Sequence, residues 1–318
     1  MKPPFLITLR QASSVGLTKT FFTLIMLFLK SFSSFLRSLP EDAVVEVNRS
    51  KMLLFPKKGG IHLDLFLHHK REPICTQYLA KTNLIRNGDN VVDVGANIGY
   101  YVLIESKLVG SRGKIYAIEP VKDNFNLLVK NLEINGLSNV SSYQLAFGGR
   151  SGKGEIYVSQ HSNLCRMEKV TVEESDHDIV GTQEVQVETV DAFLKDKEVP
   201  KLIRMDVEGY EYEIIKGMPE TLKHDVVVLM ELHPMYLGRK IDPLLKILQE
   251  NHFKVRFAVV EDKVNENVFI RSIIGKIRGY RLPVYIANAS INELRNMIAK
   301  NSEFAPNAFF EKDYHSKD

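Results

Sequence analysis

The chain has 318 residues, of which 44% are hydrophobic and 25% are charged, and it contains 19 Gly and 12 Pro. These values are close to the averages of globular proteins, so they exclude a disordered chain, a collagen-like repeat and a membrane protein with many spans. The formal charge of +3 is uneven, because residues 1–40 carry five basic and no acidic side chains and the other 278 residues carry a net charge of −2. A nucleic acid is therefore a poor candidate for the substrate.

Residues 1–40 are expected to form an amphipathic helical segment. Apolar side chains recur there every three or four positions, while Lys30 and Arg37 lie on another face. The uncharged run from Thr20 to Leu29 has ten residues, half of the roughly 20 that a helix needs to span a bilayer. Two roles stay open for residues 15–39. The helix docks on the protein or on a second copy of it, or it lies against anionic lipid.

Cysteine usage favours a reducing compartment. Cys75 and Cys165 are far apart in the sequence and form no C-x-x-C pattern, which argues against a disulfide framework and against a zinc site. The cytoplasm is the expected location, with peripheral attachment to a membrane if the N-terminal helix binds lipid.

Residues 41–88 are interpreted as a lead-in subdomain, 89–290 as the main domain, and 291–318 as a C-terminal helix and tail. Within the lead-in, the basic run from His68 to Arg71 is interpreted as a solvated turn, and the alternative is that Arg71-Glu72-Pro73 faces a cleft. From Val91 onward, apolar runs alternate with helical patterns, which is typical of βαβ units and a mostly parallel sheet. Strands are predicted near 91–95, 114–119, 140–147, 201–206, 226–232, 254–260 and 283–288.

The first motif with chemical meaning joins a strand, a turn and a helix. Asp93 lies near the end of a buried strand, and Gly95 and Gly99 allow the backbone of the next turn to approach a ligand closely. Asn97 stands where a dinucleotide fingerprint has its middle glycine, and its side chain occupies space that a pyrophosphate would need. The next strand ends at Glu119, whose acceptor-only carboxylate is placed to bind two ribose hydroxyls. A nucleoside cofactor without a pyrophosphate fits this pattern.

A second group of residues follows two later strands. Asp206 ends one predicted strand, and Glu231 and His233 alternate on one face of its neighbour. Because the carboxyl ends of parallel strands form the ligand crevice, these side chains are expected to converge beside the cofactor. Glu208 and Glu211 are explained equally well as acids that the dipole favours at a helix start.

Three segments with this chemistry stand at the ends of predicted strands: Asp93-Val94-Gly95-Ala96-Asn97-Ile98-Gly99-Tyr100, Ala117-Ile118-Glu119-Pro120 and Met205-Asp206-Val207-Glu208-Gly209-Tyr210-Glu211. In these segments the chain resembles the FkbM family of S-adenosylmethionine-dependent methyltransferases, over roughly residues 85–235. The resemblance implies a class I methyltransferase fold, an α/β Rossmann-like fold with a seven-stranded, mostly parallel sheet and helices on both faces. It also implies O-methylation of a hydroxyl on a sugar, glycan or small natural product, and it does not identify the acceptor.

The resemblance implies a cofactor site made of Asp93, Gly95, Asn97, Gly99, Glu119, Ala146 and Phe147. Gly95, Asn97 and Gly99 would surround the methionine end of S-adenosylmethionine. Asp93 would orient the methionine amino group, directly or through water, and Glu119 would bind the ribose. Ala146 and Phe147 would lie at the level of the adenine, where the third strand of the sheet ends.

Methyl transfer from a sulfonium is a direct displacement, so the protein aligns the acceptor oxygen and removes its proton. His233 is the candidate base because imidazole titrates near neutral pH. Asp206 is its carboxylate partner or accepts a hydrogen bond from the substrate hydroxyl, and Glu231 lies beside it. This metal-free site is preferred, and the alternative is Mg²⁺ held by Asp206, Glu231 and His233.

Two other function classes remain open. One is a catalytically silent scaffold with the same fold, and the other is an NAD-dependent oxidoreductase, which Asn97 disfavours.

Overall fold

The computed structural model describes residues 37–159, 179–261, 283–301 and 305–313, together with residues 34, 165 and 167. Most of the expected N-terminal amphipathic helix lies outside these residues, so the docking and lipid roles predicted for it fall outside the described structure. No helix in the described ranges is long and apolar enough to cross a membrane.

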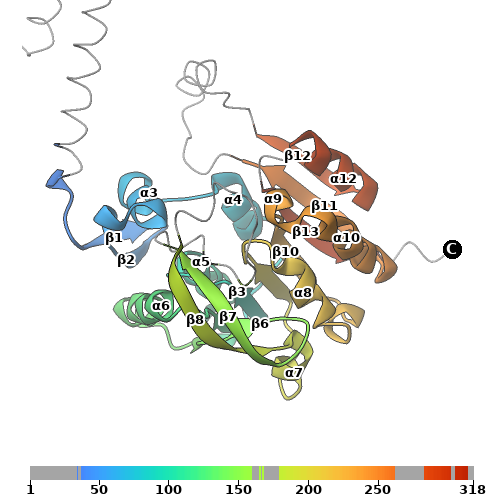
Figure 1. Ribbon diagram of the computed structural model, residues 1–318, viewed down its shortest axis with the longest axis horizontal. Coiled ribbons are helices and arrows are strands. Elements are labelled where there is room, and N and C mark those ends of the chain that lie inside the picture. Colours follow the sequence, from blue (N-terminus) through green and yellow to red (C-terminus); the bar gives the residue numbers. More distant parts are fainter. Residues whose placement is uncertain are drawn as a thin grey trace, which may run out of the picture.

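The centre of the molecule is one eight-stranded sheet (Figure 1). In spatial order its strands are β12 (Val284–Ala289), β11 (Phe253–Val260), β13 (Asn307–Lys312), β10 (Val227–Glu231), β9 (Leu202–Met205), β3 (Asn90–Val94), β4 (Lys114–Ile118) and β5 (Val140–Tyr143). The five strands from β10 to β5 pair in parallel. The strand β13 is antiparallel to both of its neighbours, and β12 is antiparallel to β11. The predicted α/β fold with a mostly parallel sheet is confirmed.

The sheet has one strand more than expected, because β13 lies in the stretch interpreted as a C-terminal helix and tail. It fills the space between β10 and β11, where Phe309 and Phe310 are fully buried. The main domain therefore does not end at residue 290, since residues 307–312 complete its sheet. Only three apolar residues stand in this run, and so short a pattern does not reveal that the chain returns to the middle of a sheet.

Both faces of the sheet are buried by helices, as the apolar runs predicted. Within β3, Val91 belongs to one hydrophobic cluster while Val92 and Val94 belong to the other, because successive side chains of a strand point to opposite faces. The first cluster is completed by α3 (Gly60–His68), α4 (Pro73–Lys81), α5 (Tyr100–Val109) and α6 (Lys122–Ile134). The second is completed by α7 (Val190–Leu194), α8 (Glu211–Lys216), α10 (Ile241–Glu250) and α12 (Ile291–Lys300).

The lead-in segment shares the core of the main domain. It begins with the hairpin of β1 (Ala43–Val47) and β2 (Ser50–Leu54), whose two turn residues, Asn48 and Arg49, have the positive φ angles that such a tight turn requires. Met52 and Leu54 are buried in the same cluster as α5 and α6. Short helical turns connect other elements: η1 (Pro56–Lys58), η2 (Gly110–Arg112), η4 (Thr221–Lys223), α9 (Pro234–Leu237) and η5 (Gly238–Lys240).

The strand predicted over 140–147 divides into two. The strand β5 ends at Tyr143, and β6 (Ala146–Phe147) leaves the central sheet to pair with β8 (Ile179–Glu188), which also pairs with β7 (Gly152–Ser159). Ala146 and Phe147 therefore do not finish the third strand of the central sheet. The break could not be predicted from the sequence, because Ala146 and Phe147 are apolar residues, as buried as those of a central strand.

Candidate active site

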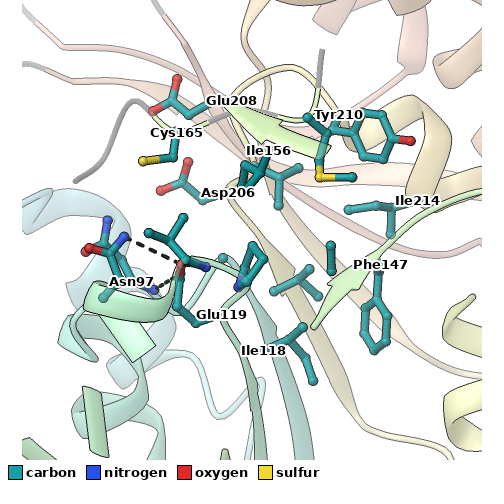
Figure 2. A pocket seen from close by; sticks show the side chains of 18 residues that line it. Asn97, Ile118, Glu119, Phe147, Ile156, Cys165, Asp206, Glu208, Tyr210 and Ile214 are labelled. Atoms are coloured by element: carbon teal, nitrogen blue, oxygen red, sulfur yellow. Dashed lines mark hydrogen bonds between the residues drawn. The ribbon is translucent and has the colours of Figure 1, made fainter. Parts of the chain in front are cut away.

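A pocket of about 620 Å³ opens at the carboxyl ends of β3, β4 and β9 (Figure 2). Of the ten predicted site residues, six line it: Gly95, Asn97, Glu119, Ala146, Phe147 and Asp206. The other four, Asp93, Gly99, Glu231 and His233, lie outside its lining. The structure thus places six of the predicted residues around one pocket and the other four behind or beside it.

The turn between β3 and α5 is held in a left-handed backbone conformation. Gly95, Asn97 and Gly99 all have positive φ angles, of 77°, 49° and 96°. A Cβ atom on Gly95 would collide with the backbone oxygen of Asp206, so the end of β3 approaches the end of β9 more closely than any other residue type allows. Asn97, at the position of the middle glycine of a dinucleotide fingerprint, takes the left-handed conformation that Asn tolerates better than most residues. The turn therefore brings the backbone up to the pocket, as the motif requires.

Glu119 is the polar centre of this side of the pocket. Its Oε2 accepts a hydrogen bond from the backbone N–H of Asn97 at 2.8 Å, and its Oε1 accepts one from that of Val121 at 2.9 Å (Figure 2). Burial raises the pKa of this carboxyl to about 7, although both hydrogen bonds act to lower it. Oε1 also accepts a long hydrogen bond from Asn124 Nδ2 at 3.5 Å, while Oε2 has lone-pair capacity for a further donor. The carboxylate can therefore accept from a ribose hydroxyl, and from a second one where it replaces the long bond to Asn124.

An apolar surface lies beside Glu119. Ile118, Phe147 and Ile214 line the pocket together, and Tyr210 and Ile156 extend this wall (Figure 2). Phe147, which was expected at the level of the adenine, is both buried and part of the lining. These side chains provide two things that a purine base needs, apolar contact and the exclusion of water.

Asp93 is a partner of Arg204 and does not form a wall of the pocket. The two residues lie opposite each other in the parallel pairing of β3 and β9, and Arg204 Nη1 donates to Asp93 Oδ1 at 2.8 Å. Arg204 Nη2 also donates to Asp206 Oδ2 at 3.1 Å, and the guanidinium lies 3.8 Å from the centre of the Tyr101 ring. The direct contact expected between Asp93 and a methionine amino group is therefore not supported. Sequence reasoning missed Arg204. A single basic residue inside the apolar run 202–205 could have indicated a buried cation that needs a carboxylate partner.

Asp206, Glu231 and His233 converge as predicted, and two further carboxylates join them. His233 Nε2 lies 3.2 Å from Glu208 Oε2, 3.8 Å from Glu231 Oε1 and 3.9 Å from Asp206 Oδ1. On the other side of the ring, Nδ1 lies 3.1 Å from Glu211 Oε1. We call these five residues the charged cluster. The interpretation of Glu208 and Glu211 as simple helix-start acids is incomplete, because both contact the imidazole.

The protonation of His233 differs from the expectation. Burial alone would lower the pKa of this imidazole, but the surrounding carboxylates, Glu208 above all, outweigh burial and raise the pKa well above its usual value. The carboxylates therefore favour the charged form of the ring, in which neither nitrogen has a lone pair to accept a proton from a hydroxyl. His233 therefore differs from the neutral base with an ordinary pKa that the sequence suggested.

Arg71 is a second residue that sequence reasoning missed. It was interpreted as part of a solvated turn, yet it is only 6% exposed. The Tyr100 hydroxyl fixes its backbone, donating to the Arg71 carbonyl and accepting from the Arg71 N–H, both at 2.7 Å. Burial acts to lower the pKa of Arg71, but the field of Glu72, Glu231 and other carboxylates leaves it raised. Its guanidinium pairs with Asp64 at 3.8 Å and with Glu72 at 3.5 Å, so the lead-in segment places a cation within the electrostatic influence of Glu231 and Asp206.

Comparisons with known proteins agree with this geometry. The family model of the methyltransferase FkbM domain matches residues 93–282. The hexuronic acid methyltransferase AglP of Haloferax volcanii is 29% identical over 148 residues, which are 46% of this chain and 56% of that protein. A protein-L-isoaspartate O-methyltransferase of Methanosarcina mazei is 39% identical over 57 residues, 18% of this chain and 24% of that protein. The chain thus spans just over half the length of the first relative.

Two solved structures are also similar. A SAM-dependent O-methyltransferase from Thermotoga maritima gives a TM-score of 0.43 at 17% identity, with 87% of this chain and 79% of that chain covered. M. jannaschii TYW2 in complex with AdoMet gives 0.41 at 16% identity, with 87% and 89% covered. Because the family model matches more than half of the residues, the chain belongs to the FkbM methyltransferase family, and its cofactor is S-adenosylmethionine.

Proposed function

We propose that this protein transfers the methyl group of S-adenosylmethionine to a hydroxyl group of a sugar or glycan. The observation that carries the proposal is that Glu119, held by two backbone N–H groups, faces the same pocket as Asp206 and Glu208 of the charged cluster. One pocket thus combines a nucleoside site with a group of proton acceptors. The similarity to a hexuronic acid methyltransferase supports a sugar as the acceptor.

The described residues fit S-adenosylmethionine. The Glu119 carboxylate is suited to the two ribose hydroxyls, and Ile118, Phe147 and Ile214 offer an apolar surface for the adenine. The close approach of backbone at Gly95 leaves the turn next to the pocket without side-chain obstruction. When bound, the cofactor supplies an electrophilic methyl group on a sulfonium.

The protein's own part in the reaction is to hold the acceptor hydroxyl in line and to accept its proton. Asp206 and Glu208 line the pocket, and their side chains are 24% and 10% exposed. Arg204 fixes Asp206 from behind, and the imidazole of His233 fixes Glu208. Alignment contributes about 7 kcal/mol or more of the barrier in favourable cases, and a positioned proton acceptor contributes about 10²–10⁴-fold. In this proposal His233 orients carboxylates and does not itself act as the free base.

The proposal extends to a partner for residues 15–39, on the grounds of the sequence alone. An amphipathic helix with five basic and no acidic side chains in residues 1–40 binds either anionic lipid or a second copy of the chain. Flotation of the full chain with anionic vesicles and measurement of its molecular mass in solution distinguish these two partners. A monomer that does not float would remove both.

Two measurements test the proposed function. Calorimetric titration should show binding of S-adenosylmethionine and no binding of NAD, since a preference for NAD would favour an oxidoreductase. Transfer of a labelled methyl group should then be followed on a panel of sugars, with neutral hexoses beside hexuronic acids. Cofactor binding without transfer to any acceptor in the panel would support the scaffold alternative and count against the enzyme.

A further inference from the structure

The charged cluster has the arrangement of a metal site as well as of an acid–base site. Glu211 is fully buried, and its Oε1 accepts from the Gly209 N–H at 3.2 Å while lying 3.1 Å from His233 Nδ1. With the Nδ1 proton donated to Glu211, Nε2 is the atom that faces the other carboxylates, and a divalent cation bound there would take the place of the Nε2 proton of the charged ring. A histidine oriented through its second nitrogen by a buried carboxylate is the usual support of a metal-ligating imidazole.

The distances around Nε2 suit a divalent ion. Two ligands at right angles about an ion with bonds of ~2.1 Å lie ~3.0 Å apart. Nε2 lies 3.2 Å from a Glu208 oxygen and 3.9 Å from an Asp206 oxygen, and one ligand atom of each of these three residues lies within 4.8 Å of the others. Small rotations of the carboxylates would bring all three onto one ion. The Glu231 oxygen, at 3.8 Å from Nε2, is close enough to act as a fourth ligand.

The charge balance also calls for a cation. Four carboxylates surround one imidazole, and two of them, on Glu211 and Glu231, are almost completely buried. Arg204 divides its hydrogen bonds between Asp206 and Asp93, so it offsets only part of this negative charge. Arg71 is a further cation in the field of Glu231 and Asp206, but it also pairs with Glu72 and Asp64. The cluster therefore keeps an excess of negative charge that a divalent cation would balance.

We propose that Asp206, Glu208 and His233, backed by Glu231, bind a divalent cation of the Mg²⁺ or Mn²⁺ type. Carboxylate oxygens suit both ions, and one imidazole nitrogen favours Mn²⁺ over Mg²⁺. Asp206 and Glu208 line the pocket (Figure 2), so an ion held by them would keep a coordination position open toward the acceptor. This inference rests on the proposed function. The ion would bind the acceptor hydroxyl and lower the pKa of that hydroxyl, and a carboxylate alone does not lower it.

The test is direct binding of Mn²⁺ to the full chain, followed through the loss of the electron paramagnetic resonance signal of free Mn²⁺. We expect saturation at one ion per chain and displacement by Mg²⁺. Glu208→Gln and Asp206→Asn, which remove charge but little volume, should each weaken binding by about 10-fold or more. Glu213→Gln is the matched control, because its carboxylate pairs with Lys216 outside the cluster, and it should bind Mn²⁺ as the parent chain does.

The same preparations separate this inference from the proposed function. Calorimetry with S-adenosylmethionine shows that each variant is folded and that its cofactor side is intact. No saturable Mn²⁺ binding at millimolar concentrations, or equal binding by the parent chain and both cluster variants, would overturn the metal site. Methyl transfer that withstands a chelator would also overturn it and leave the methyltransferase proposal standing. Specific Mn²⁺ binding without methyl transfer to any acceptor would support the site and count against that proposal.

Discussion

The two sides of the pocket hold their charges in different ways. On the cofactor side, Glu119 is fixed by backbone N–H groups of Asn97 and Val121. On the acceptor side, carboxylates are fixed by other side chains: Arg204 joins Asp206 to Asp93 on the neighbouring strand, and His233 lies against Glu208. Backbone donors stay in place when a neighbouring side chain changes. The cofactor side should therefore respond to substitution locally, and the acceptor side cooperatively.

The largest expected effect is from Arg204→Met on the acceptor side. It would leave Asp93 fully buried without its cationic partner and release Asp206. Breaking such a buried pair by removing one partner costs about 3–5 kcal/mol, and urea denaturation measures that loss. The control is Arg295→Met, because the Arg295 pair with Asp242 is largely exposed, and it should cost at most about 1 kcal/mol. Equal losses in the two variants would show that the Arg204 network is not the cooperative unit described here.

Glu119→Ala tests whether the cofactor side responds locally. Loss of hydrogen bonds to a charged group should weaken S-adenosylmethionine binding by about 1.5–3 kcal/mol, which is about 10- to 150-fold. Mn²⁺ binding at the charged cluster should stay unchanged. Calorimetry measures the affinity, and Glu133→Ala, on the exposed face of α6, is the control. Unchanged cofactor affinity in the folded Glu119 variant would remove this carboxylate from the site.

The same contrast explains how much of the site the sequence could predict. The strand, turn and helix around Gly95 and the acid at Glu119 were predicted correctly, because their geometry depends on residues close in the chain and on backbone groups. The pairing of Asp93 with Arg204 depends on which strands become neighbours in the sheet. No local pattern contains that information, so Asp93 was expected to face the ligand.

The fold shows the same limit. The parallel strands β3, β4, β9 and β10 were predicted within a residue or two, since each is a largely apolar run of its own. The strand β13 and the division between β5 and β6 were missed, because only the tertiary partners decide where those short segments pair. The solvated turn expected at Arg71 was wrong for a related reason. Its burial depends on the Tyr100 hydroxyl, which lies 29 residues away in the chain.

Tyr100→Phe tests whether the lead-in segment supports the acceptor side of the pocket more than the cofactor side. The substitution removes the hydroxyl that bonds both the N–H and the carbonyl of Arg71, and unsatisfied buried groups cost about 1–3 kcal/mol. We expect a loss of about 2 kcal/mol in the free energy of unfolding and slower methyl transfer, with cofactor affinity unchanged. Tyr285→Phe is the control, because Tyr285 is 66% exposed. A fall in cofactor affinity as large as the fall in transfer rate would mean that the lead-in supports both sides equally.

The smallest effect concerns pH and the cofactor side alone. Burial raises the pKa of Glu119 to about 7, so below this pH the carboxyl carries a proton, and above it both oxygens are free to accept from hydroxyls. If only the ionised form binds the ribose, the affinity for S-adenosylmethionine should rise by about tenfold between pH 6 and pH 8. Binding itself favours the charged form, because hydroxyl donors stabilise a carboxylate. The affinity of Glu119→Gln should be low and flat over this range, since its amide does not titrate. A parent chain with the same flat profile would show that Glu119 is ionised throughout, and the two sides of the pocket would then differ in cooperativity but not in protonation.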